Sequence, residues 1–154
     1  MSVFLSDEQS LPLDLAGLRN LANLVLEHEA YPAATEVSVL LVSDEVIAEH
    51  NTRFMGREGP TDVLAFPIEE LEPGCPPVSR PGTPPPMLGD VLIAPEQVRR
   101  QAVEHGVDFD HELALMVVHG MLHLMGYDHA DEEEAVEMEG REGVILAGIG
   151  VRRP

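Results

Sequence analysis

Residues 112–129 read ELALMVVHGMLHLMGYDH, and this stretch indicates how the whole chain folds. Its apolar residues recur at the spacing of a helix that packs one face against a core. Those positions are Leu113, Met116, Val117, Gly120, Met121 and Leu124. We expect Gly126 to end this helix, because glycine readily takes the left-handed conformation found after many helices. The pattern predicts a packed helix that starts at Asp108 or Asp110.

Three histidines lie in the same stretch. His119 and His123 are four residues apart, which on a helix places their Cβ atoms ~5–6 Å apart on one face. His129 follows Gly126 by three residues, which span at most ~10 Å, so it must return close to the pair. Three neutral imidazoles can bind one Zn²⁺ and leave a position for water, as in catalytic zinc sites. We therefore predict that His119, His123 and His129 bind one zinc ion.

A more ordinary interpretation exists for these histidines. Two histidines on a half-buried helix are as often polar residues with backbone partners as they are metal ligands. The third histidine, placed after a helix-ending glycine, favours the metal. The single cysteine, Cys75, cannot form a thiolate cluster or an internal disulfide, so the ligands must be histidine or carboxylate.

The remaining sequence alternates short β-branched runs with helical patterns. We expect strands near residues 3–5, 36–42, 61–67 and 88–94, and helices near 14–31, 43–56, 95–105 and 131–146. Because the order is not a strict strand–helix alternation, the pattern favours the α+β class. We predict a single domain over residues 1–154, with a small three- to four-stranded mixed sheet packed with four to five helices.

One segment does not fit any regular element. Residues 71–87 read LEPGCPPVSRPGTPPPM and hold seven of the thirteen prolines of the chain. Proline cannot donate a ladder hydrogen bond or continue a helix, so we expect an extended, mobile insertion within the domain.

The charge of the chain limits its partners. The 154 residues include 28 acidic and 9 basic side chains, all nine of them arginines, for a net charge of −19. Proteins gain affinity for nucleic acids by placing cations against phosphates, so tight binding of free RNA or DNA is not expected. No apolar run has the ~20 residues of a membrane helix. We expect a cytoplasmic protein that does not bind membranes.

The histidine spacing is shared with one class of zinc proteases. Metzincins have HExxHxxGxxH, in which the glutamate after the first histidine is the general base. Here Gly120 holds that position and cannot accept a proton. Glu112 is seven residues before His119, ~10.5 Å along the helix axis, which is too far to replace the base. A peptidase-like zinc hydrolase is therefore the weaker alternative.

Beyond the spacing, the residues resemble the bacterial YbeY endoribonuclease family. HGMLHLMGYDH resembles the family signature, and residues 60–67, PTDVLAFP, resemble its PTDVLSFP segment. Leu88-Gly89-Asp90-Val91 is similar to the start of a family strand, and Glu137-Met138-Glu139 to a run in its last helix. The resemblance spans about residues 36–148. It implies an α+β fold, one zinc, and single-strand-specific endonucleolytic cleavage in ribosomal RNA maturation and ribosome quality control.

Two positions depart from the family pattern. The family commonly has an arginine where Met55 stands, and many members have a histidine where Leu115 stands. Arg53 and Arg57 flank Met55, and either can supply the cation that stabilises charge on a cleaved phosphate. We predict that both bind substrate, although solvated surface arginines are equally common.

Weak affinity for free RNA implies that a ribosome or ribosomal protein delivers the substrate. The partners we expect are therefore single-stranded ribosomal RNA and the ribosome, with no DNA. A third possibility is a ribosome assembly factor without catalysis, in which zinc is structural. Such a site would be closed by a fourth protein ligand, which the three-histidine pattern does not supply.

Overall fold

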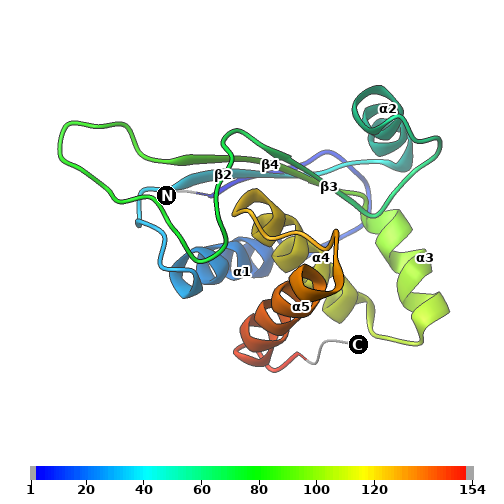
Figure 1. The fold of residues 1–154 in the computed structure, drawn as a ribbon. Coiled ribbons are helices and arrows are strands. Elements are labelled where there is room, and N and C mark those ends of the chain that lie inside the picture. Colours follow the sequence, from blue (N-terminus) through cyan, green and yellow to red (C-terminus); the bar gives the residue numbers. More distant parts are fainter. Residues whose placement is uncertain (1–2, 152–154) are drawn as a thin grey trace.

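The computed structural model describes residues 3–151 and consists of one four-stranded sheet with helices packed mainly on one face (Figure 1). In chain order the elements are β1 (Val3–Asp7), α1 (Leu15–His28), β2 (Glu36–Leu41), α2 (Asp44–Met55), β3 (Val63–Pro67), β4 (Met87–Ile93), α3 (Pro95–His105), α4 (Phe109–Leu124) and α5 (Glu132–Ala147). This arrangement confirms the predicted α+β class, with a mixed sheet of four strands and five helices in the described chain.

The sheet has the order β1-β2-β4-β3. β1 and β4 both pair with β2 in parallel, whereas β3 runs antiparallel to β4 at the other edge. Along β2 every second side chain is buried, so that Val37, Val39 and Leu41 face the main core. This period of two is the pattern of a strand whose two faces differ in burial.

The helices α1, α3, α4 and α5 lie below the sheet in Figure 1, and α2 lies beyond its opposite face at one end. Under α2 a small second cluster forms on that face from Val42, Ile47, Leu64, Leu92 and Ala94. The rest of the sheet's upper face is not covered by a helix (Figure 1).

The sequence pattern underestimated how deeply α4 is buried. A single apolar face was expected, but the helix is buried on nearly all sides, including Ala114, Leu115, Val118 and Leu122 outside the predicted stripe. The reason is that α1, α3, α5, β3 and β4 all pack around it. α4 is therefore the central helix of the domain, which explains its almost wholly apolar composition.

Gly120 makes the contact between α4 and the sheet possible. A Cβ atom at this position would lie 2.5 Å from Val91 Cγ1 and 3.2 Å from Val63 Cγ2. Because real Cβ atoms do not approach other carbons so closely, a larger residue here would require a shift of these valine side chains, the sheet or the helix. Gly120 stands at the position where metzincins have their glutamate base. The same residue allows α4 to lie close to β4.

Most element boundaries match the expected ones within a few residues. Asp108, rather than Asp110, is the N-cap of α4, and its carboxylate accepts a hydrogen bond from the Asp110 amide. α1 ends at His28, earlier than expected, because Ala30 has a positive φ of 60°. β3 begins at Val63, whose amide donates to the side chain of Asp62.

Residues 71–86 form no helix or strand and make the long excursion between β3 and β4 seen in Figure 1. The first residues of this segment pack against the rest of the chain, since the Leu71 carbonyl lies beside Gly126. None of the described helices is long and apolar enough to cross a membrane.

Candidate metal centre

A cleft of the described chain has a volume of about 1050 Å³. Its walls come from the end of α2, from β3, from residues 68–72 that follow β3, and from the C-terminal half of α4 with the turn after it. All three predicted metal ligands line this cleft.

The imidazoles of His119, His123 and His129 converge. One ring nitrogen from each lies within 4.8 Å of the other two, and no further His, Cys, Asp or Glu of residues 3–151 joins the group. The Nε2 atoms of His119 and His123 are 3.1 Å apart. Two ligand atoms on a tetrahedral zinc ion, each ~2.0–2.1 Å from it, lie ~3.4 Å apart, so this spacing fits an ion with little adjustment. These three residues can hold a metal ion.

The local backbone explains why the third histidine returns to the first two. α4 gives the four-residue spacing of His119 and His123, and Gly126 then has φ of 99°. A Cβ atom on Gly126 would lie 2.0 Å from the Leu71 carbonyl oxygen. Glycine is thus required both for the turn and for the close passage of the segment after β3.

His119 has a carboxylate partner that the sequence interpretation missed. Its Nδ1 lies 3.3 Å from Oε1 of Glu142, a residue of α5 that is 1 % exposed. An Nδ1–H that donates to this carboxylate leaves Nε2 as the free lone pair that faces His123. A signal was present, since Glu142 lies at helical spacing from buried Met138 and Ile145. A glutamate within such an apolar stripe indicates a buried polar contact.

The protonation state of His123 suits metal binding. Burial lowers the pKa of His123, and the neighbouring imidazoles of His119 and His129 lower it further. The ring is therefore neutral at pH 7, which is the form that coordinates a metal.

Asp128 acts mainly on its own turn. Its Oδ1 accepts a hydrogen bond of 2.8 Å from the amide of His129, whereas the Nδ1 atom of His129 is 3.6 Å away. The second distance is too long for a hydrogen bond. Asp128 therefore caps its own turn here and does not orient the His129 ring.

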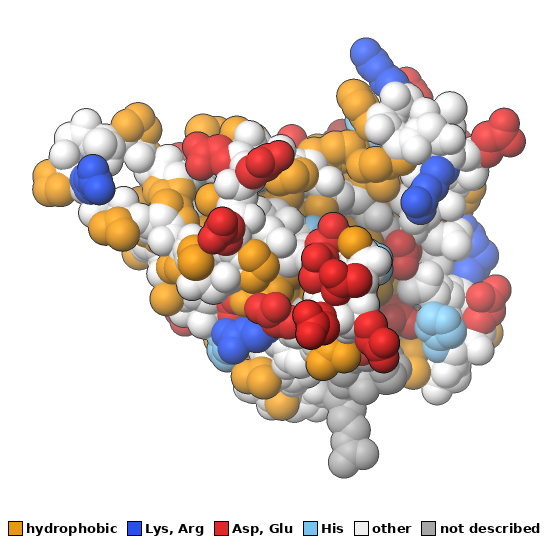
Figure 2. Space-filling model, in the orientation of Figure 1, with side chains coloured by type: hydrophobic (Ala, Val, Ile, Leu, Met, Phe, Trp, Pro, Cys, Tyr) orange, Lys and Arg blue, Asp and Glu red, His pale blue; other side chains and the backbone are white. Residues whose placement is uncertain are grey.

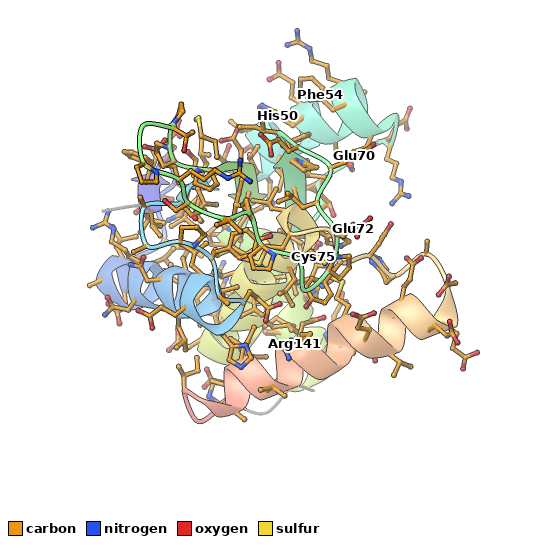
Figure 3. The ribbon with its side chains drawn as sticks, turned by 60° about the vertical axis from the view of Figure 1, so that its left-hand side comes forward. His50, Phe54, Glu70, Glu72, Cys75 and Arg141 are labelled. Atoms are coloured by element: carbon orange, nitrogen blue, oxygen red, sulfur yellow. The ribbon has the colours of Figure 1, made fainter. Side chains whose placement is uncertain are left out.

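The two candidate arginines lie in different places. Arg57 lines the cleft, as does Met55, the position at which the YbeY pattern has arginine. Arg53 is not part of the lining, and its guanidinium carbon lies 5.3 Å from the ring centre of Phe54. Figure 3 shows Phe54 on α2, with His50 one turn before it. The structure thus brings Arg57, and not Arg53, to the histidines' cleft.

The cleft is strongly acidic. Its described lining contains one arginine against five carboxylates, which are Asp62, Glu69, Glu70, Glu72 and Asp128. Figure 3 shows Glu70 and Glu72 on the segment that follows β3, with Cys75 further along. A second acidic surface lies over α5, where Glu132, Glu133 and Glu134 form the first turn (Figure 2). Both surfaces repel a polyanion unless a cation offsets them.

Comparison with known proteins gave consistent matches. The model of a family described as Endoribonuclease YbeY matches residues 6–150. An Endoribonuclease YbeY from Thermobifida fusca is 42% identical over 149 residues, which cover 96% of this chain and 94% of that protein. An Endoribonuclease YbeY from Nocardia farcinica is 43% identical, with coverage of 95% and 79%. A solution structure of a Thermotoga maritima protein has a TM-score of 0.62 and 27% identity, and covers 96% of this chain and 91% of its own.

Proposed function

Because this chain belongs to the YbeY endoribonuclease family, we propose that it is a zinc-dependent endoribonuclease that cleaves single-stranded RNA in ribosomal RNA maturation and ribosome quality control. The observation that carries this proposal is the convergence of His119, His123 and His129 in one open cleft. A group of three histidines, without a fourth ligand in the described residues, leaves room for substrate and solvent.

Each side chain of the site has a proposed task. The three histidines hold one Zn²⁺, and Glu142 keeps the His119 ring oriented through Nδ1. Arg57 lies in the same cleft and binds a non-bridging oxygen of the scissile phosphate, where its charge stabilises the developing negative charge. When bound, the metal supplies a Lewis acid that activates water for attack on the phosphodiester.

The charge of the cleft supports delivery of the substrate by a partner. Five carboxylates line the cleft, and the whole chain carries −19. Free RNA is repelled at a distance by this field, while local contacts to Arg57 and the metal act within ~8–10 Å. We propose that the ribosome or a ribosomal protein brings single-stranded ribosomal RNA to the site. We further propose a single cytoplasmic domain that binds neither membranes nor DNA.

The test combines metal analysis with a cleavage assay. Purified full-length protein is expected to contain one zinc per chain and to cut a single-stranded RNA at internal positions. The variant His123→Ala is expected to lose both the metal and the cleavage. Cleavage that persists in a metal-free sample would contradict the proposal.

The same samples separate the alternatives. A peptidase-like enzyme would turn over peptides but not RNA, which is disfavoured by Gly120 at the position of the protease base. An assembly factor with structural zinc would bind one ion, lose stability in His123→Ala, and show no RNA turnover even with ribosomal particles present.

A further inference from the structure

Of the three histidines, His129 is the one whose position is not fixed by a helix. His119 and His123 are fixed by the backbone of α4, whereas His129 lies in the turn before α5 with 58 % of its side chain exposed. Its amide donates to the neighbouring Asp128, which is part of the same turn. The backbone turn at Gly126 brings His129 toward α4, but the contact with Asp128 ties it only to its own turn, so a contact from the turn to another helix would fix its position further.

Tyr127, two residues before His129, supplies that contact. It is 5 % exposed, and its amide donates to the Leu122 carbonyl of α4 at 3.1 Å. Its hydroxyl donates a 2.6 Å hydrogen bond to Oε1 of Glu29. This bond joins the turn to the end of α1, 98 residues earlier in the sequence.

Glu29 is itself held from a second side. Its side chain is 2 % exposed, and its other oxygen accepts hydrogen bonds from Nε, at 3.1 Å, and from Nη2 of Arg141. The adjacent His28 lies 3.1 Å from the same oxygen through Nδ1. Burial by itself raises the pKa of Glu29, but the hydrogen bonds from Tyr127, Arg141 and His28 outweigh burial and lower it. Glu29 is thus a buried carboxylate at neutral pH.

Arg141 connects this group to the rest of the site. Figure 3 shows Arg141 on α5, and the next residue of that helix is Glu142, the partner of His119. One turn of α5 therefore contacts His119, through Glu142, and Glu29, through Arg141. Helices α1, α4 and α5 meet at this point.

We propose that Tyr127, Glu29 and Arg141 form a brace that positions His129 for metal binding. The inference rests on the proposed zinc site and assigns positioning roles to Glu29 and Arg141, which do not touch the cleft. If the turn is already held in place before the metal binds, it loses little conformational freedom when His129 coordinates the metal. The affinity of the site for the metal is therefore higher. Loss of the brace is expected to weaken zinc binding about tenfold, at the lower end of the effect of outer contacts on metal sites.

The first test compares two buried tyrosines. Tyr127→Phe removes the hydroxyl that donates to Glu29 and keeps the ring. Tyr31→Phe is the control, since the buried Tyr31 hydroxyl also lies near enough to Glu29 to feel its charge but has no hydrogen-bond partner among residues 3–151. Zinc alone is titrated into metal-free, full-length protein in competition with a chromophoric chelator at pH 7. We expect a dissociation constant about tenfold higher for Tyr127→Phe and no change for Tyr31→Phe.

The second test compares two buried carboxylates. Glu29→Gln keeps the size of the side chain but removes the charge that pairs with Arg141. Glu112→Gln is the control. Glu112 is also buried, its Oε2 lies 3.0 Å from Nδ1 of His105, and it is not part of the brace. Both variants are expected to be less stable than the wild type, but only Glu29→Gln is expected to bind zinc more weakly.

Cobalt substitution gives a signature that a purely structural role would not change. The visible spectrum of Co²⁺ reports its ligands, so the spectrum of Tyr127→Phe is expected to shift toward that of His129→Ala. Spectra and zinc affinities equal to wild type in both Tyr127→Phe and Glu29→Gln would overturn the brace while leaving the metal site intact. A wild-type protein that binds no zinc would overturn the proposed function and the brace together.

Discussion

The Nδ1 atom of His119 lies 3.3 Å from a carboxylate oxygen of Glu142, although 23 residues separate the two in the sequence. Glu142 projects from α5 and is 1 % exposed, so the contact is shielded from water. A carboxylate in this position holds the imidazole in one orientation and one tautomer. The chemistry of the site thus depends on how α5 docks against α4.

Replacing the partner of His119 is expected to weaken the metal site. Glu142→Gln keeps the shape of the side chain but removes the charge that favours a proton on Nδ1, so we expect a 10- to 100-fold loss of zinc affinity. Chelator competition measures the loss. Glu137→Gln, on the exposed side of the same helix, is the matched control. Equal zinc affinity in the two variants would remove Glu142 from the site.

Gly120 of α4 and Gly140 of α5 are expected to respond to replacement by alanine in opposite directions. Gly120→Ala forces a methyl group against Val91 and is expected to lower the free energy of unfolding by ~1–3 kcal/mol. Gly140→Ala in α5 meets no atom within 4 Å, so helix propensity is expected to raise it by ~0.5–1 kcal/mol. Urea unfolding of metal-free protein measures both. A neutral or stabilising Gly120→Ala would show that α4 can shift away from the sheet.

The acidic wall of the cleft is expected to weaken RNA binding. Replacing Glu69, Glu70 and Glu72 together by glutamine should tighten binding of a single-stranded RNA at low salt, and the gain should shrink as salt screens the charges. The control replaces three glutamates outside the cleft lining, Glu49, Glu104 and Glu133, for the same change in net charge. An equal gain in both triple variants would attribute the effect to net charge rather than to the cleft.

Arg57 is expected to matter more for RNA cleavage than Arg53. Arg57→Gln removes the one arginine of the described cleft lining, and we expect kcat/KM to fall about tenfold or more, because a cation near the phosphate is lost. Arg53→Gln affects a side chain that lies against Phe54 outside the lining. A loss in Arg53→Gln as large as that in Arg57→Gln would show that the arginines rearrange when RNA binds.

Acid is expected to remove the stability that Glu29 provides. The pKa of Glu29 is lowered in the folded chain relative to its ordinary value of 4.5. A group with a depressed folded pKa stabilises the fold fully above its unfolded pKa, and this contribution is lost as the pH falls through the folded value. The titratable groups that face Glu29 are His28, Tyr31, Tyr127 and Arg141.

The corresponding experiment compares wild type with Glu29→Gln. The wild type is expected to be the more stable of the two at pH 7, and the difference should narrow as the pH drops below about 4.5. Denaturant unfolding at a series of pH values measures this difference. A gap that is constant from pH 7 to pH 3 would mean that the pKa of Glu29 is the same in the folded and the unfolded chain.

Much of the architecture followed from local patterns in the chain. The β-branched run at residues 36–42, the helical patterns that begin near residues 14 and 43, and the apolar spacing of α4 predicted where strands and helices lie. In the structure Asp14 and Ser43 are the N-caps of α1 and α2. These signals are local, because a cap or a periodic face involves residues within one or two turns. The spacing of His119, His123 and His129 is local in the same sense, so their grouping was predictable from helix geometry.

What the tertiary structure alone decided lies in contacts between segments far apart in the chain. Glu142 against His119 and Glu29 against Tyr127 depend on how α1 and α5 pack on α4. The choice of Arg57 over Arg53 depends on the direction in which the chain leaves α2. Spacing along a sequence does not specify such docking, because it is decided by the packing of whole elements around the core.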